Sequence, residues 1–117
     1  MGALRLLLLA GWAGLAAITL WALLELGVAA APATFVSDLA HPWRAQFYAD
    51  FELHLLLVAG WILWREQWRP LAWLFAVATM LLGALFTFPY ILFAAARAKG
   101  DPAVLLLGRR RGAARHD

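Results

Sequence analysis

Residues 41–68, HPWRAQFYADFELHLLLVAGWILWREQW, decide the fold of this chain. The stretch opens with tryptophan and arginine, continues as an apolar run and ends in a second group of tryptophans and charges. Three ionisable residues, Asp50, Glu52 and His54, stand in the first turns of what reads as a membrane-spanning helix. Because the flanking segments are apolar and almost free of charge, any chemistry of the protein is expected to centre here.

The composition indicates a membrane protein. Of the 117 residues, 65% are hydrophobic and the mean hydropathy is +0.75, whereas soluble domains are about half apolar. The chain has no cysteine, which excludes disulfides, thiol catalysis and cysteine-ligated metal centres. The net charge is +3, and the basic residues concentrate near the C-terminus. In so apolar a chain their expected partner is anionic lipid, and no nucleic-acid binding is predicted.

Three long apolar blocks predict an all-α integral membrane protein with three transmembrane helices. The expected spans are residues 6–30, 45–64 and 71–96 in a membrane domain of residues 1–97, followed by a basic tail of residues 98–117. Helices of this length approach or exceed the ~30 Å apolar core of a bilayer. The first block has an alternative interpretation as a cleaved signal peptide, although its length and the position of Glu25 argue against cleavage.

The segments between the blocks predict how the spans are connected and anchored. A short helix is expected in the interface within residues 35–43, and a tight polar turn joins the second and third spans as an antiparallel hairpin. Pro89 removes the backbone hydrogen bond that would reach Leu85, so a kink is expected there, with Thr87 or Tyr90 satisfying the freed carbonyl. Four tryptophans are expected as interface anchors: Trp43, Trp64, Trp68 and Trp73.

Basic residues predict the orientation and a lipid contact. With three spans, three Lys and Arg residues fall on the side of the N-terminus and seven on the side of the C-terminus. The positive-inside rule then places the N-terminus outside and the C-terminus inside the cell. The tail arginines are expected to bind anionic lipids: Arg109, Arg110, Arg111 and Arg115.

Three spans would also bring the polar residues of the helices into one leaflet. The expected members of this one-sided pocket are Glu25, Asp50, Glu52, His54, Thr87, Tyr90 and Arg97. In one interpretation the acidic residues lie near the interface, pair with Arg44 and Arg97, and fix the depth and packing of the helices. In another they form a cavity that binds a proton, a cation or a lipid headgroup. No known metal, phosphate-binding or nucleophile motif is present, so no catalytic residue, metal or cofactor is predicted.

The central region resembles a family of small uncharacterised membrane proteins. The matching residues, in order, are Pro42-Trp43, Asp50-Phe51, Trp61, Glu66, Tyr90, Asp101-Pro102 and Val104-Leu105. In this order and spacing, residues 41–107 resemble the DUF1475 family, and DUF2834 proteins are similar in general plan. The resemblance implies a membrane location and a three-helix plan, and it implies no reaction.

The leading hypothesis from the sequence is a non-enzymatic structural or accessory subunit that works in a homo-oligomer or a larger membrane complex. One alternative is a small transporter or channel protomer that uses Glu25, Asp50 and His54. A further alternative is an intramembrane enzyme that acts on lipid or isoprenoid substrates, in which a buried carboxyl group with a raised pKa serves as the acid.

Overall fold

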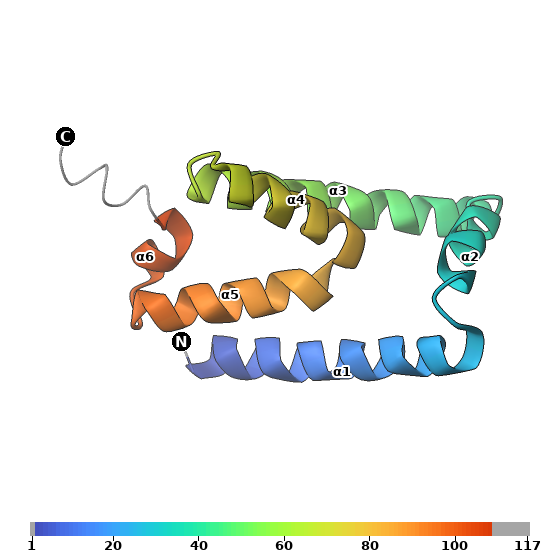
Figure 1. Cartoon of the computed structure of the whole chain (residues 1–117), viewed down its shortest axis with the longest axis horizontal. Coiled ribbons are helices and arrows are strands. Elements are labelled where there is room, and N and C mark those ends of the chain that lie inside the picture. The colour runs from blue at the N-terminus through green and yellow to red at the C-terminus, as the bar shows by residue number, and fades with distance from the viewer. Residues whose placement is uncertain (1, 109–117) are drawn as a thin grey trace.

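The computed structural model describes residues 2–108, which contain helices and no strand (Figure 1). In chain order the helices are α1 (Gly2–Leu26), α2 (Ala30–Asp38), α3 (Pro42–Arg65), α4 (Pro70–Leu82), α5 (Ala84–Ala98) and α6 (Pro102–Leu107). Within these described residues the prediction of an all-α fold is confirmed. The tail arginines expected to bind anionic lipid, Arg109, Arg110, Arg111 and Arg115, lie outside the described residues.

Two helices, α1 and α3, are long and apolar enough to cross a membrane. They contain 25 and 24 residues, which at ~1.5 Å per residue exceeds the ~30 Å apolar core of a bilayer. Only 6% of the most apolar part of α1 and 22% of that of α3 are buried within the chain, so most of their apolar surface is free to face lipid. Helix α1 ends earlier than expected because Gly27 adopts a positive φ of 79°.

The short helix α2 joins the two long helices and is attached to the start of α3. Asp38 accepts hydrogen bonds from Arg44 at 3.0 Å and from the Tyr48 hydroxyl at 2.9 Å. The Phe35 and Tyr48 rings pack with centroids 4.9 Å apart. Arg44 therefore pairs with Asp38, and the expected pairing of Arg44 with Asp50 or Glu52 is not found.

The single helix predicted for residues 71–96 is wrong. The chain breaks at Gly83, whose φ of 58° and ψ of −131° are avoided by residues with a side chain. Helix α4 runs from the α3–α4 turn to the middle of the molecule, and α5 returns to the end where α6 lies (Figure 1). The Phe75 and Phe86 rings of the two arms lie 5.6 Å apart. The third apolar block is therefore a half-length hairpin.

Small side chains let the hairpin pack closely against both long helices. Helix α4 lies antiparallel to α3, as expected, over a buried cluster of Ala59, Leu63, Ala72 and Ala76. Helix α5 packs on the N-terminal half of α1, where a side chain at Gly11 would meet the Phe88 ring at 2.8 Å. Alanines and glycines at such contacts allow helix backbones to approach closely, which is typical of helix packing in membranes.

Pro89 lies inside α5 and leaves the Leu85 carbonyl without its helical donor. The Trp12 indole N–H of α1 donates to this carbonyl at 3.0 Å. The expectation that Thr87 or Tyr90 would satisfy the carbonyl is wrong, because the return of α5 along α1 brings Trp12 within reach. The break in the third block lies at Gly83, and α5 continues through Pro89.

Candidate functional site

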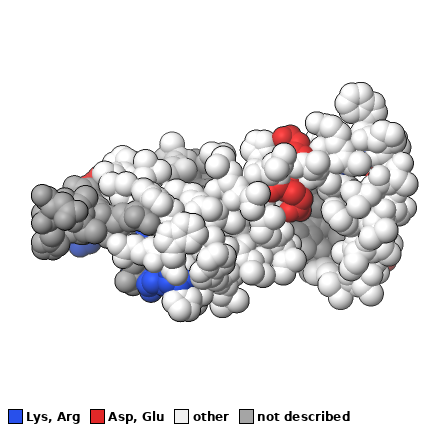
Figure 2. Space-filling model, turned by 90° about the horizontal axis from the view of Figure 1, so that it is seen from above, with Lys and Arg blue, Asp and Glu red and all other residues white. Residues whose placement is uncertain are grey.

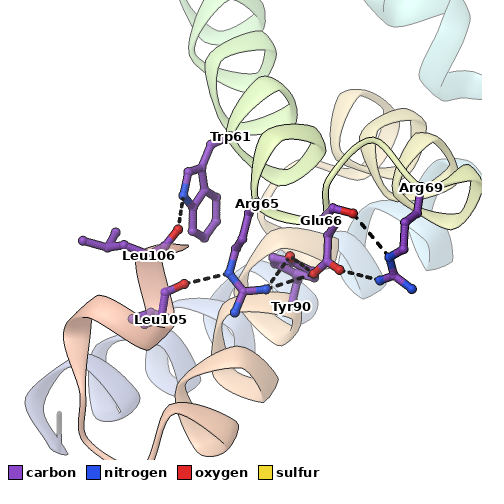
Figure 3. Close-up of polar contacts among 7 residues, drawn as sticks. All are labelled: Trp61, Arg65, Glu66, Arg69, Tyr90, Leu105 and Leu106. Carbon is purple, nitrogen blue, oxygen red and sulfur yellow. Dashed lines mark hydrogen bonds and ion pairs between the residues drawn. The ribbon is translucent and has the colours of Figure 1, made fainter. Parts of the chain in front are cut away.

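A compact ionic cluster closes the end of the molecule where α3 meets α4 (Figure 3). At its centre is Glu66, the first residue after α3. One oxygen of its carboxylate accepts from the Tyr90 hydroxyl at 2.6 Å and from Arg65 Nη1 at 2.9 Å. The other oxygen accepts from Arg69 Nη2, which comes from the same turn. Four side chains from two segments of the chain are thereby joined around one carboxylate.

The same cluster also holds helix α6 in place. Carbonyl groups in the last turn of a helix have no donor within that helix. Arg65 Nε donates to the Leu105 carbonyl at 2.7 Å, and the Trp61 indole donates to the Leu106 carbonyl at 3.2 Å. Both carbonyls belong to the last turn of α6, whose negative dipole end also favours a nearby guanidinium. Arg65 therefore connects α3, α5 and α6.

The charged side chains at the centre of this cluster are buried, so the fold depends on their pairing. The side chains of Arg65 and Glu66 are each only 10% exposed. Burial opposes ionisation of Glu66, but hydrogen bonds from Tyr90 and Arg69 and the charges of Arg65 and Arg69 outweigh it, so the pKa of Glu66 lies below its ordinary value. Within residues 2–108, every buried side-chain nitrogen or oxygen has a hydrogen-bond partner. Glu66 is therefore held as a carboxylate at neutral pH.

Aromatic rings pack against the cluster. The Tyr90 ring meets Trp61 edge-on at 6.1 Å and lies 5.7 Å from Phe75. The Arg65 guanidinium carbon lies 5.6 Å from the centre of the Tyr90 ring and 5.9 Å from that of Trp61. Cation–π contact of this kind is one reason for arginine to be favoured over lysine at a buried site.

A cavity of about 450 Å³ adjoins the cluster between the α3–α4 turn, α4, α5 and α6. Arg65, Glu66, Arg69, Tyr90 and Arg97 supply its polar wall, and side chains such as those of Phe75 and Phe93 supply its apolar wall. Counting charges on the lining residues, three arginines face one glutamate, so the cavity carries a formal charge of +2.

The structure separates the residues that were predicted to share one pocket, so that grouping is wrong. Tyr90 and Arg97 line the cavity, and Thr87 is buried one turn before Tyr90. Asp50 lies 16 residues before Glu66, or ~24 Å along the helix axis, and pairs with His54 instead. Glu25 is exposed at the far end of α1, and Glu52 is half-buried. The reversal at Gly83 is the cause, because it returns α5 to the opposite end from these residues.

Sequence reasoning missed Arg65, Glu66 and Arg69 as site residues. These charges stand between two tryptophan-rich segments and were consistent with a solvated turn. One signal points to them, namely a tyrosine within the apolar block 71–96, which needs a hydrogen-bond partner when buried. Among the expected anchors, Trp64, Trp68 and Trp73 are exposed around the turn and Trp43 is exposed at the start of α3.

Together these features define a small helical protein with two helices of membrane-spanning length, a half-length hairpin and a buried ionic cluster. Within residues 2–108, no group of three or more histidine or carboxylate side chains is arranged to hold a metal ion. Comparisons with family models, with curated proteins and with solved structures each found no match.

Proposed function

We propose that this chain is a non-enzymatic subunit of a homo-oligomeric assembly in the membrane. The observation that carries the proposal is the pair of ionisable side chains on α3, Asp50 and His54. Their nearest side-chain atoms lie 3.3 Å apart, and the two side chains are 63% and 73% exposed. Ionisable residues inside a spanning helix usually face protein or water. A second copy of the chain covers this face in the proposed assembly.

The pair is suited to contact with its own copy. Symmetric dimers bury the same patch on both subunits, so a patch that holds an acceptor and a donor one turn apart is self-complementary. Asp50 of one subunit accepts a hydrogen bond from His54 of the other in this arrangement, and the reverse contact forms by symmetry. Phe47 lies on the same face and is exposed, so it supplies apolar contact beside the polar pair.

The cluster around Glu66 supports a structural role over acid catalysis. An intramembrane acid catalyst needs a carboxyl group with a raised pKa, and Glu66 shows the opposite direction because Tyr90, Arg65 and Arg69 stabilise its charge. Through Arg65, the cluster around Glu66 joins α3, α5 and α6, as expected of a group that holds helices together. The resemblance to the DUF1475 family agrees with this proposal only in assigning no reaction.

We also propose that α1 and α3 are the two membrane spans and that the first turn of α1 and helix α6 face the cytoplasm. The prediction that the two termini lie on opposite sides of the membrane required three crossings. In this proposal the half-length hairpin does not cross the membrane, so two crossings remain. Five of the six described basic residues lie at the end that carries α6: Arg5, Arg65, Arg69, Arg97 and Lys99. The sixth, Arg44, lies at the α2 end. In Figure 2 the Lys and Arg surface lies in the half with α6, and the larger acidic patches lie in the other half.

Cysteine cross-linking tests the assembly, because the native chain contains no cysteine. Phe47→Cys places a thiol on the Asp50 face, and Leu56→Cys places one at an exposed position about 180° around the helix. The expected result is a disulfide-linked dimer for Phe47→Cys and little for Leu56→Cys. Asp50→Asn should reduce the Phe47→Cys dimer, whereas Glu52→Gln should not. Equal cross-linking at both positions, or a monomer by native mass measurement in lipid nanodiscs, contradicts the proposal.

A transporter protomer is the second candidate, because the same exposed pair lines a path if several copies surround it. A transporter protomer must carry protons or ions across the membrane. Purified protein in liposomes containing a pH-sensitive dye should then dissipate an imposed proton gradient, and Asp50→Asn should abolish that flux. The structural proposal expects no flux from either protein.

A further inference from the structure

We propose that the cavity beside the ionic cluster binds the phosphate group of an anionic phospholipid. This site is distinct from the Asp50 face and does not depend on the oligomeric state. The ligand class follows from three features of the cavity, namely its free guanidinium donors, its apolar wall and its level relative to the long helices.

All three arginines have donors available to a ligand. Arg65 bonds through Nε and Nη1, so its Nη2 makes no bond within the described residues. Arg65 lines the cavity, and its Nη2 is not among fully buried atoms without a partner, since the described residues contain none. Arg69 bonds through Nε and Nη2 and is 34% exposed, which leaves its Nη1.

Of the three arginines, Arg97 makes the fewest polar contacts. Its guanidinium carbon lies 4.8 Å from the centre of the Phe93 ring, and it makes no ion pair within residues 2–108. Stacking on Phe93 holds the guanidinium plane without using its N–H donors. Guanidinium groups bind phosphate oxygens in a bidentate manner. With Glu66 compensating only one positive charge, the cavity can neutralise a phosphate of charge −1 or −2.

The apolar wall and the position of the cavity favour a lipid over a free anion. Phe75 and Phe93 face the cavity beside the arginines, so a ligand with both a phosphate and an apolar portion satisfies both walls. The cavity begins where α3 ends, and Trp68 and Trp73 pack beside the turn with rings 6.0 Å apart. Tryptophans of this kind are typical of the headgroup level of a bilayer. The phosphate of a lipid lies at that level.

Native mass spectrometry of the full chain, titrated with dioleoyl phosphatidic acid in neutral detergent, tests this site. The wild-type protein should bind one phosphatidic acid tightly, and dioleoyl phosphatidylcholine should bind weakly. Arg97→Gln should weaken phosphatidic acid binding about tenfold or more, because it removes a charged donor. Lys99→Gln is the matched control, since it removes the same charge two residues away, outside the cavity lining.

Three outcomes overturn the proposal. Equal weakening by Arg97→Gln and Lys99→Gln indicates attraction to overall charge. Tight binding that is lost only when Arg109, Arg110, Arg111 and Arg115 are changed to glutamine places the lipid contact on the tail. Inorganic phosphate that displaces phosphatidic acid at comparable concentration identifies a free anion as the ligand. Arg97 is exposed, so its variant is expected to fold, and an unchanged circular dichroism spectrum checks that.

Discussion

Replacing Glu66 with glutamine should destabilise the protein more than any other change of a single carboxylate in the described residues. The carboxylate accepts from Tyr90, Arg65 and Arg69 and is only 10% exposed. Glutamine retains the shape but has one acceptor oxygen and no charge. Removing one partner of a buried ion pair costs ~3–5 kcal/mol.

Part of that cost is recovered by the remaining contacts. Arg65 keeps its bond to the Leu105 carbonyl, and Arg69 is partly exposed and can turn to water. The expected loss in free energy of unfolding for Glu66→Gln is therefore ~2–4 kcal/mol. Tyr90→Phe keeps the ring contacts and removes the hydroxyl, so it should cost ~1–2 kcal/mol and be non-additive with Glu66→Gln.

Unfolding in mixed micelles by sodium dodecyl sulfate, followed by tryptophan fluorescence and circular dichroism, measures these differences. Glu52→Gln is the matched control, because Glu52 lies on α3, is half-buried and makes no ion pair within the described residues. It should change stability by less than ~0.5 kcal/mol. If Glu66→Gln costs no more than Glu52→Gln, or if its cost simply adds to that of Tyr90→Phe, the cluster does not hold the helices together.

Three further predictions use the same unfolding measurement. The pKa of Glu66 is lowered in the folded state, so the stability that its carboxylate contributes is fully present above its ordinary pKa of 4.5. This stability is lost as the pH falls through the lowered pKa. The difference in unfolding free energy between wild type and Glu66→Gln should therefore shrink on acidification. Trp12→Phe removes the donor to Leu85 and should cost ~1–3 kcal/mol, but less in a Pro89→Ala background, where residue 89 regains an N–H for that carbonyl. Gly83→Ala should cost ~1–3 kcal/mol because of its backbone conformation, with added crowding since a Cβ there would lie 3.2 Å from Phe51.

The chain offers a control for each of the last two substitutions. Trp21 is exposed on the uncovered half of α1, so Trp21→Phe should leave stability almost unchanged. Gly60 is helical and a Cβ there would meet nothing within 4 Å, so Gly60→Ala should stabilise by ~0.5–1 kcal/mol. Equal effects at Trp12 and Trp21, or at Gly83 and Gly60, contradict the assigned roles.

Much of the helical framework was predictable from local signals. Long apolar runs predicted α1 and α3, because apolar composition and length are properties of the segment itself. Pro42 and Pro70 occupy first turns of helices, where proline has no backbone donor to lose. The short polar turn after Arg65 predicted that α3 and α4 pack as neighbours. The pairing of the charges within that turn was not predictable, because their main partner, Tyr90, lies 24 residues away from Glu66.

The sequence by itself determined a helical chain and predicted three apolar spans, of which two, α1 and α3, are helices long and apolar enough to cross a membrane. Only the tertiary structure decided the direction of residues 84–98. An apolar run interrupted by one glycine is compatible with a continuous span and with a reversal, since Gly83 tolerates both conformations. Contacts far apart in sequence select the reversal, namely Trp12 with Leu85, Glu66 with Tyr90 and Arg65 with Leu105. These contacts bring Arg65, Glu66 and Tyr90 together at one end of the molecule and leave Asp50 and His54 exposed in the other half.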